Sequence, residues 1–315
     1  MSFGRDDEPH EEASPEEAFA ALGNEHRLAI IHALWEAYNP LDSDASVPFS
    51  VLYDQVGIGD TGNFNYHLNQ LLGHFVRQTD EGYALTPRGF EVAQSLIPYT
   101  VPDAAWIDSV EIDVPCIHCE SPITFSHDGE YSIATCQSCT GQWEIEGTGY
   151  LFIFTFPQAG VIGRSPVEIF HATIEYTFHK ISMFRDGICP ACSGRVATAV
   201  DVCDTHQAEE HDVCPSCDRH HQVEHTYHCT RCKTSISGPI AMDILDEPAV
   251  SAFLAEQGID HDFASWETFV RGHNLTEEVH SIDPLRVLVR MEEQGAHLEI
   301  ELDDQLDIVT IERSS

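Results

Sequence analysis

The feature that most constrains this chain is a set of eleven cysteines, all of which lie between Cys116 and Cys232. Ten of them form five Cys-x-x-Cys pairs, and the eleventh, Cys203, forms a Cys-x-x-His pair with His206. A Cys-x-x-Cys turn brings two thiolates of one loop to the same metal ion, and two facing turns complete a tetrahedral shell. Eleven cysteines and one histidine therefore predict three complete sites.

Disulfide bonds are the alternative for these cysteines, but the odd number, the regular spacing and an expected reducing cytosol argue against them. Thiolate and imidazole ligands favour zinc over calcium or magnesium, whereas iron stays an alternative. Four protein ligands fill a tetrahedral shell and leave no position for water or substrate. We therefore expect up to three structural zinc sites and no enzymatic activity.

The order of the pairs along the chain predicts which ligands share an ion. The first unit takes Cys116, Cys119, Cys136 and Cys139, the second takes Cys189, Cys192, Cys203 and His206, and the third takes Cys214, Cys217, Cys229 and Cys232. This sequential pairing closes the shortest loops, an entropic advantage of about a kcal/mol. Two alternatives stay open: a cross-braced pairing between the second and third units, and replacement of His206 by a neighbouring histidine. The candidates are His211, His220, His221, His225 and His228.

Each unit is expected to contain a short hairpin. The first has its turn at residues 127–129, and the alternating stretches at 196–200 and 222–228 make the second and third units look like an internal repeat. Units this short cannot build a hydrophobic core of their own. Metal binding, worth ~10–16 kcal/mol per site, is therefore expected to supply most of their stability.

Charge is the second constraint, because 53 acidic residues face only 15 lysines and arginines, for a net charge of −38. The acid is spread over both halves, and the only lysines are Lys180 and Lys233. Such a surface is typical of a salt-accumulating, halophilic cytosol, where the Debye length falls to about 3 Å at 1 M salt and self-repulsion is screened. An acidic composition therefore does not argue strongly against nucleic-acid binding here.

Three windows depart from the acidic background. Residues 61–79, 147–167 and 225–242 contain no Asp or Glu, although composition alone would place about three acids in a window of 19 residues. An apolar strand region accounts for the second window and the third metal unit for the last. The first window is polar, which makes it the exception.

A helical pattern precedes the cysteines. Apolar residues recur at helical spacing over residues 18–35, with a break at residues 23–24, and residues 51–56 form another candidate helix with Ser50 as its cap. In residues 63–75 one helical face is apolar, and the opposite face carries Asn63, Tyr66, Asn69 and Gln70, flanked by Asn65 and His67. A hairpin turning at residues 80–82 and a closing helix over 90–97 follow. This is the order of a winged helix-turn-helix.

Residues 16–97 resemble the winged-helix DNA-binding domains of the arsenic-repressor (ArsR) family. LGNEHRLAIIHAL is similar to the first long helix of that family, NFNYHLNQL to its recognition helix and EGYALTPRG to its wing. With the metal units behind it, the chain resembles haloarchaeal winged-helix regulators that carry zinc-binding C-terminal halves. The resemblance implies double-stranded DNA as partner and a homodimer that reads paired half-sites. Metal-sensing members carry cysteines in the helix before the recognition helix, and residues 51–56 have none.

Salt also affects which side chains suit DNA recognition. Counterion release weakens lysine and arginine contacts as salt rises, whereas Asn and Gln pair with adenine edges through neutral groups. Arg77 and Arg88 flank the wing and suit a phosphate or minor-groove contact. A merely solvated surface is the alternative for the amides, and packing for His67. The predicted DNA-contacting residues are Asn63, Asn65, Tyr66, His67, Asn69, Gln70, Arg77 and Arg88.

The expected fold class is α+β with several domains. The segments are a winged helix-turn-helix over 1–100, a first zinc ribbon over 101–150, a connector strand and spacer helix over 151–186, tandem second and third zinc ribbons over 187–236, and a C-terminal α+β domain with an antiparallel meander over 237–315. The most apolar run, residues 151–163, is shorter than the ~20 residues of a membrane helix. The acidic start does not resemble a secretory signal.

These patterns together predict a cytoplasmic, DNA-binding transcriptional regulator with structural zinc sites. The alternative is a zinc-ribbon adaptor that binds proteins of the transcription or translation machinery, with the helix-turn-helix as a protein contact. No phosphate loop or nucleophile arrangement occurs in the C-terminal part, which could hold an effector or form a dimer surface.

Overall fold

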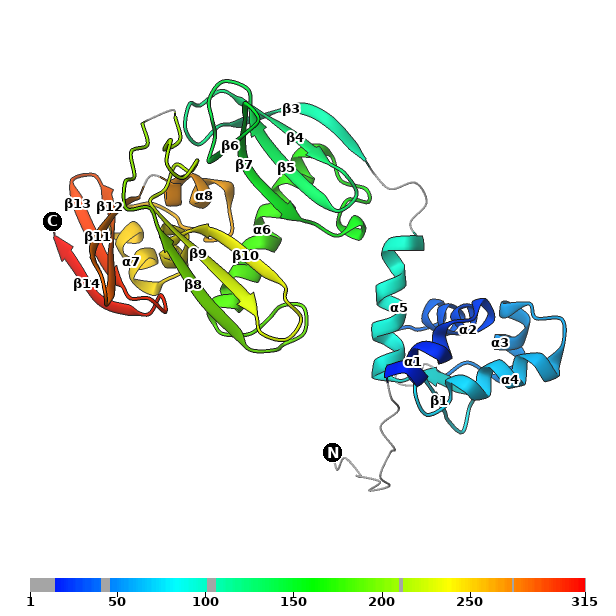
Figure 1. Cartoon of the computed structure of the whole chain (residues 1–315). Coiled ribbons are helices and arrows are strands. Elements are labelled where there is room, and N and C mark those ends of the chain that lie inside the picture. The colour runs from blue at the N-terminus through cyan, green and yellow to red at the C-terminus, as the bar shows by residue number, and fades with distance from the viewer. Residues whose placement is uncertain (1–14, 41–45, 101–105, 210–211, 274, 315) are drawn as a thin grey trace. The chain divides into compact units, whose positions relative to one another are not determined.

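The computed structural model describes residues 15–40, 46–100, 106–209, 212–273 and 275–314. In these residues the chain is a mixed α+β protein with eight α-helices and four antiparallel sheets. It divides into two compact units, Met1–Pro102 and Asp103–Ser315, and each is described by itself (Figure 1). No helix in this described part of the chain is long and apolar enough to cross a membrane.

The first unit consists of helices and one small hairpin. In chain order its elements are α1 (Pro15–Leu22), α2 (Glu25–Glu36), α3 (Phe49–Val56), α4 (Thr61–Leu71), β1 (Val76–Gln78), β2 (Tyr83–Leu85) and α5 (Pro87–Thr100). The predicted helices and the hairpin are confirmed. One detail is wrong, because α3 begins at Phe49 after Pro48, so that Ser50 lies within the helix and does not cap it.

Local chemistry sets the orientation of α4. Asp60 begins the helix, since its side chain accepts the N–H of Asn63 at 2.9 Å. Phe64, Leu68 and Leu71 are buried on its inner face. The apolar side of α4 thus belongs to the core of the first unit, and its polar side is left at the surface.

The second unit begins with a five-stranded sheet in the order β3-β4-β5-β7-β6. The strands are β3 (Ile107–Pro115), β4 (Pro122–His127), β5 (Tyr131–Cys136), β6 (Trp143–Ile145) and β7 (Thr148–Thr155), followed by a short 3-10 turn, η1 (Gln158–Gly160). Helix α6 (Pro166–Arg185) starts with a capping box between Ser165 and Glu168. It packs on this sheet through Phe170, whose ring lies 5.6 Å from that of Phe152.

Two further sheets complete the second unit. The three-stranded sheet, in the order β10-β9-β8, contains β8 (Val196–Val202), β9 (Val223–Cys229) and β10 (Ser235–Pro239). After the 3-10 turn η2 (Ile240–Ile244) come α7 (Pro248–Glu256), α8 (Trp266–His273), β11 (Thr276–Ile282), β12 (Leu285–Glu293), β13 (Ala296–Leu302) and β14 (Ile308–Ser314). The predicted meander is confirmed, with its strands paired in chain order. Both helices contact it, through the ion pairs Arg271–Glu293 and Arg313–Glu256.

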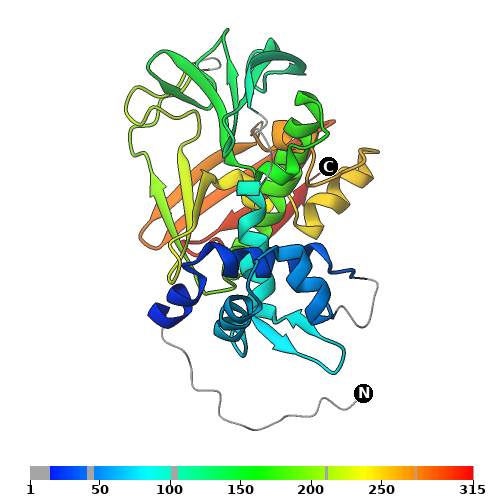
Figure 2. The same cartoon turned by 90° about the vertical axis from the view of Figure 1, so that its right-hand side faces the viewer.

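One hydrophobic core runs through the whole second unit. Phe152 of the first sheet, Tyr227 of the three-stranded sheet and Val289 of the meander belong to the same buried cluster, together with Phe170 of α6. Helix α6 contacts the first sheet and also β9 (Figures 1 and 2). Four cysteines are part of this buried cluster, so the segments that carry them are attached to a common core; they are Cys116, Cys136, Cys189 and Cys229.

Glu277 of β11 ties the meander to the three-stranded sheet, because its carboxylate accepts the N–H of Val223 at 3.1 Å. Burial raises the pKa of this carboxyl from 4.5 to about 7, although backbone N–H groups, that of Val223 first, oppose the shift. Between these two pH values the folded state keeps a proton that the unfolded state has lost. The stability linked to this proton is present below pH 4.5 and is lost as the pH rises to about 7.

The substitution Glu277→Gln keeps a side-chain oxygen that can accept the N–H of Val223, and it removes the ionisable carboxyl. We expect the variant to exceed the wild type in free energy of unfolding by about 1–3 kcal/mol at about pH 8 and by less at about pH 5.5. Denaturant unfolding of both zinc-loaded proteins in molar KCl measures the difference. If the difference in free energy of unfolding between the variant and the wild type stays constant over this pH range, the raised pKa of Glu277 is contradicted.

Candidate metal centres

All twelve predicted ligands fall into three compact groups, within each of which the ligand atoms lie no more than 4.8 Å apart. The first cluster is Cys116, Cys119, Cys136 and Cys139; the hairpin-base cluster is Cys189, Cys192, Cys229 and Cys232; the loop cluster is Cys203, His206, Cys214 and Cys217. All eleven cysteines are free thiols. The groups can therefore hold metal ions, as the sequence predicted, and zinc suits their ligand types.

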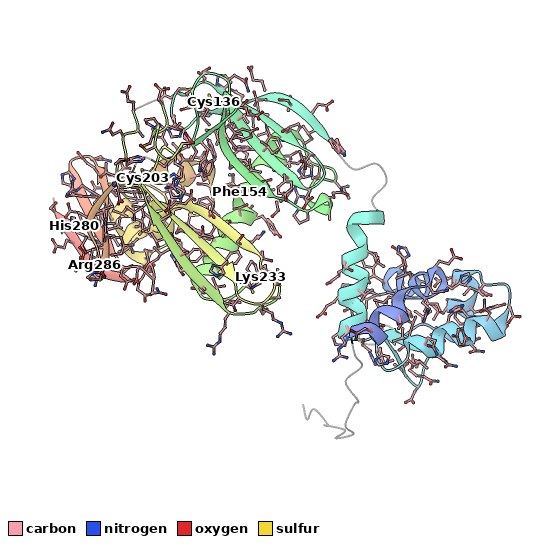
Figure 3. The ribbon with its side chains drawn as sticks, viewed as in Figure 1. Cys136, Phe154, Cys203, Lys233, His280 and Arg286 are labelled. Atoms are coloured by element: carbon pink, nitrogen blue, oxygen red, sulfur yellow. The ribbon has the colours of Figure 1, made fainter. Side chains whose placement is uncertain are left out.

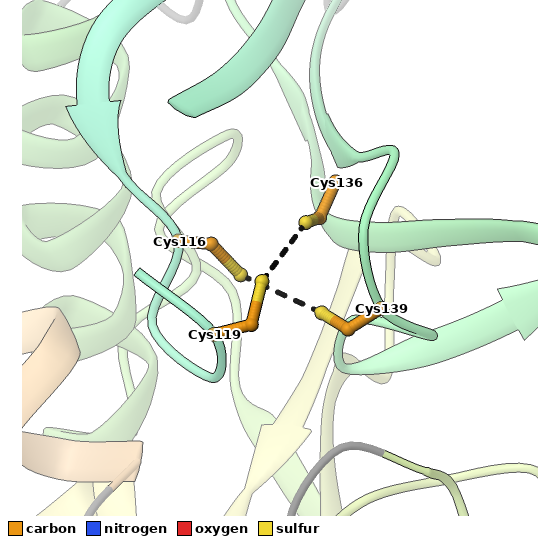
Figure 4. A group of neighbouring side chains, drawn as sticks. All are labelled: Cys116, Cys119, Cys136 and Cys139. Carbon is orange, nitrogen blue, oxygen red and sulfur yellow. Dashed lines mark hydrogen bonds between the residues drawn. The ribbon is translucent and has the colours of Figure 1, made fainter. Parts of the chain in front are cut away.

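The spacing of the sulfur atoms fits a tetrahedral ion. In the first cluster, Sγ of Cys116 lies 3.7 Å from Sγ of Cys139, and Sγ of Cys119 lies 3.5 Å from Sγ of Cys136 (Figure 4). A disulfide would need about 2.05 Å. Four sulfurs placed about 2.3 Å from zinc stand about 3.8 Å apart, which is close to the separations found here.

The sequential pairing of the remaining ligands is wrong, because Cys189 and Cys192 meet Cys229 and Cys232. The sulfur of Cys189 lies 3.6 Å from that of Cys232, and the sulfur of Cys192 lies 3.5 Å from that of Cys229. All four ligands of the loop cluster lie between Cys192 and Cys229 in the chain, so that one cluster is nested within the other in sequence. The two predicted hairpins are therefore one hairpin, and the internal repeat does not exist.

Strand pairing explains the nested arrangement. Strands β8 and β9 are antiparallel, with Val196 opposite Cys229 and Val202 opposite Val223. The turn before β8 and the turn after β9 thus lie at one end of the hairpin. Cys203 to Cys217 lie in the connection at the other end, and Figure 3 shows Cys203 and Lys233 at these opposite ends.

In the loop cluster a histidine completes the shell. Nδ1 of His206 lies 3.6 Å from Sγ of Cys217, which matches the about 3.6 Å expected between nitrogen and sulfur on one tetrahedral zinc ion. Its other nitrogen, Nε2, donates to the carbonyl of His220 at 3.2 Å and so fixes the tautomer that presents Nδ1. Burial lowers the pKa of His206, which favours the neutral imidazole that a metal requires.

The five Cys-x-x-Cys turns share one local structure. In each, the N–H two residues after the first cysteine donates to that cysteine's sulfur at 3.3–3.4 Å. In four of them the residue after the second cysteine has a positive φ, between 54° and 68°: these are Glu120, Ser193, Asp218 and Lys233. The repeated N–H donation stabilises thiolates, which are the metal-binding form.

In the hairpin-base cluster the pKa of Cys232 is lowered, whereas that of Cys192 is raised by the neighbouring thiols Cys232 and Cys229. The hydroxyl and the N–H of Thr234 lower the pKa of Cys232 to about 6, and the hydroxyl oxygen lies 3.2 Å from the sulfur. Cys232 and Cys192 are exposed, whereas Cys189 and Cys229 are buried. Each of the three clusters supplies four ligands, so the arrangement suits a closed, structural ion better than a catalytic one.

The loop cluster is held against the first cluster by contacts that the sequence did not reveal. Gln142 donates to Nδ1 of His221 at 2.6 Å, and the N–H of His220 donates to the carbonyl of Gln142 at 3.1 Å. The rings of His118 and His220 stack with centroids 4.2 Å apart. No spacing rule links Gln142 to His221, because the two residues lie 79 positions apart in the chain.

The predicted DNA-contacting residues all lie in the first unit, and seven of the eight are exposed. They are Asn63, Asn65, Tyr66, Asn69 and Gln70 on α4, Arg77 on β1 and Arg88 on α5. His67 is the exception, because it is only 7% exposed and its ring lies 5.2 Å from that of His26. Burial, with nearby His26 and Arg27, also lowers the pKa of His67. His67 is thus a packed residue of the core and drops out of the predicted contact set.

The fold and the clusters define a two-unit α+β protein with three preformed metal-binding groups in its second unit. A family model described as "Domain of unknown function (DUF7351)" matches residues 113–308, which is more than half of the chain, so the chain belongs to that family. A second, described as "Domain of unknown function (DUF7347)", matches residues 15–96. Comparison with curated proteins gives no match, and comparison with solved structures gives none either.

Zinc stoichiometry tests the nested pairing. With three zinc ions per chain in the wild type, Cys189→Ser/Cys229→Ser should lose one ion, because both ligands belong to one cluster. Cys189→Ser/Cys214→Ser should lose two, because the ligands belong to different clusters. Metal analysis of the purified proteins, with thiol titration as a check on folding, measures the content.

The matched control is a second double variant, in which both substituted ligands belong to the loop cluster. Cys203→Ser/Cys214→Ser removes two ligands of the loop cluster and should cost one ion. The sequential pairing makes the opposite prediction for this variant and for Cys189→Ser/Cys229→Ser, namely the loss of two ions each. That result would reject the nested assignment.

Proposed function

We propose that this protein is a DNA-binding transcriptional regulator, whose first unit is a winged helix-turn-helix that reads DNA through α4 and whose second unit holds three structural zinc ions. The observation that carries the proposal is the exposed amide face of α4. Asn63, Asn69 and Gln70 are exposed there beside Tyr66, which is 59% exposed.

The order of the elements supports this assignment. Helices α2, α3 and α4, the β1–β2 hairpin and α5 follow one another as in a winged helix-turn-helix, with α4 in the position of the recognition helix. The hairpin takes the position of the wing. Arg77 on β1 and Arg88 near the start of α5 are exposed and suit contacts to phosphates.

The electrostatic argument concerns the acid-free segment. Residues 61–79, which contain α4 and β1, lack acidic residues in a chain of net charge −38. The segment itself carries no carboxylate, although Asp60 caps α4 and Asp80 follows β1. Concentrated salt screens these and the other acids of the molecule within about 3 Å at 1 M. Neutral hydrogen bonds from Asn and Gln to base edges lose little of their strength in such salt.

The zinc clusters contribute structure in this proposal. Each cluster offers four ligands, and cysteines of the first and hairpin-base clusters belong to the common core of the second unit. We infer a cytoplasmic homodimer, since winged-helix regulators read paired half-sites. A protein adaptor is the competing outcome, and the experiment below separates the two.

Substitution on α4 is the direct test. Asn69→Ala and Gln70→Ala should each weaken binding to the selected operator about 5- to 100-fold, because each amide supplies a bidentate base contact. The operator is first selected from random duplexes at about 2 M KCl, which screens non-specific binding. Band shifts of the variants on that duplex give the affinities.

Gln94→Ala is the matched control, since Gln94 is an exposed amide on α5 of the same unit. It should bind like the wild type. Failure to select any duplex, together with a protein partner that co-purifies and is released by the α4 variants, would instead support the adaptor. Equal binding by all three variants and the wild type would exclude α4 as the reading helix.

A further inference from the structure

The second unit contains a cavity that the zinc clusters and α4 do not explain. Its volume is about 420 Å³, and it lies between strands of the first sheet, helix α6 and strand β10. Its lining includes four aromatic residues, Tyr131, Trp143, Tyr150 and Phe154, and also Ile236 of β10. Phe154, labelled in Figure 3, lies on the part of the first sheet near β10. Sites for small ligands typically enclose about 300–1,000 Å³ behind mainly apolar and aromatic walls.

Two of the acid-free windows meet at this cavity. Tyr150 and Phe154 belong to residues 147–167, and Ile236 belongs to residues 225–242. None of the lining residues is Asp or Glu, in a chain with 53 acidic residues. The two windows are far apart in sequence, and the fold brings them to one place. Parts of both windows therefore contribute to one lining that carries no acid.

One cation faces this neutral surface. Lys180 of α6, one of only two lysines in the chain, lines the cavity. Its Nζ donates to the hydroxyl of Thr155 at 3.2 Å and lies 5.1 Å from the ring centre of Tyr176. Among the ion pairs of the described residues, none involves Lys180. The hydrogen-bonding and ring partners of the ammonium group are thus neutral, and the thiolate of Cys189 in the hairpin-base cluster also acts on its charge.

Apolar groups at the cavity remain in contact with water. Ile145 is 49% exposed, Ile153 is 44% exposed and Tyr131 is 37% exposed. Covering such side chains gains free energy in proportion to the apolar area removed from water. A ligand that combines a flat apolar body with one negative charge would cover them and supply the carboxylate or sulfonate that Lys180 lacks.

We propose that this cavity binds a small aromatic anion, with its ring against the aromatic lining residues and its acidic group at Nζ of Lys180. The site does not depend on DNA binding. It belongs to the second unit alone, so its test does not require an operator.

The probes are anilinonaphthalene sulfonate and its uncharged analogue phenylnaphthylamine, which share the aromatic body and differ in the anion. Fluorescence titration of the full, zinc-loaded chain at about 2 M KCl measures both, with the salt screening contacts to the general surface. We expect one saturable site per chain for each probe, with the sulfonate bound more tightly. The chain has four tryptophans, so the part of the energy transfer that is lost in Trp143→Phe reports the proximity of the probe to the cavity wall.

Two pairs of variants test separately the charge of Lys180 and the open space of the cavity. Lys180→Met should weaken the sulfonate about tenfold and leave phenylnaphthylamine nearly unchanged, while Lys180→Arg keeps the sulfonate bound. Ser237→Trp, at an exposed cavity residue of β10, should abolish the binding of both probes by filling the space. Its matched control, Thr310→Trp, adds the same side chain at an exposed position of β14.

Zinc content and circular dichroism confirm that each variant is folded. The proposal is overturned if neither probe saturates, if Lys180→Met weakens both probes equally, or if Ser237→Trp and Thr310→Trp bind the probes alike. Tight binding of phenylnaphthylamine with no preference for the sulfonate would equally reject an anion site.

Discussion

The antiparallel pairing of β8 with β9 is the interaction on which the metal chemistry of the second unit depends. It places the turn at Cys189 beside the turn at Cys229 and leaves the loop cluster in the connection between the strands. The first cluster follows the same plan, because its turns precede β4 and follow β5, which are also paired. The hairpin-base cluster is therefore a ribbon of the same kind, with a second metal site inserted at the far end of the hairpin.

The same pairing explains what sequence could and could not predict. Ligand identity is a local property, since a Cys-x-x-Cys turn needs only its own few residues, and all twelve predicted ligands lie in the three groups that could hold a metal ion. Ligand pairing is a non-local property. Loop entropy favoured the sequential order by only about a kcal/mol, and the ladder from Val196 to Val202 outweighs so small a preference. The alternating stretches at 196–200 and 222–228 were recognised as strands, but a strand pattern does not specify its partner.

Prediction was most accurate where caps and periodicity act within a few residues. The helices of the first unit, the hairpin turning at residues 80–82 and the final meander all follow from such signals. His67 shows the limit of this approach, because a residue at the edge of an apolar helical face can point either way, and packing against His26 decides. The contacts of Gln142 with His221 could not be read from the chain at all, since the two residues come together only when the first sheet and the loop cluster meet.

Because this protein is so acidic, segments without Asp or Glu are candidates for binding surfaces. In a chain with 53 acidic residues, a polar or aromatic segment without any of them stands out from the rest. Residues 61–79 form one such patch around α4, and the two other windows converge on the cavity beside Lys180. In concentrated salt a carboxylate costs little at the surface, because screening removes most of its repulsion. If α4 meets a DNA groove and the cavity an aromatic anion, as proposed, a carboxylate at either place would lose its water without gaining a partner.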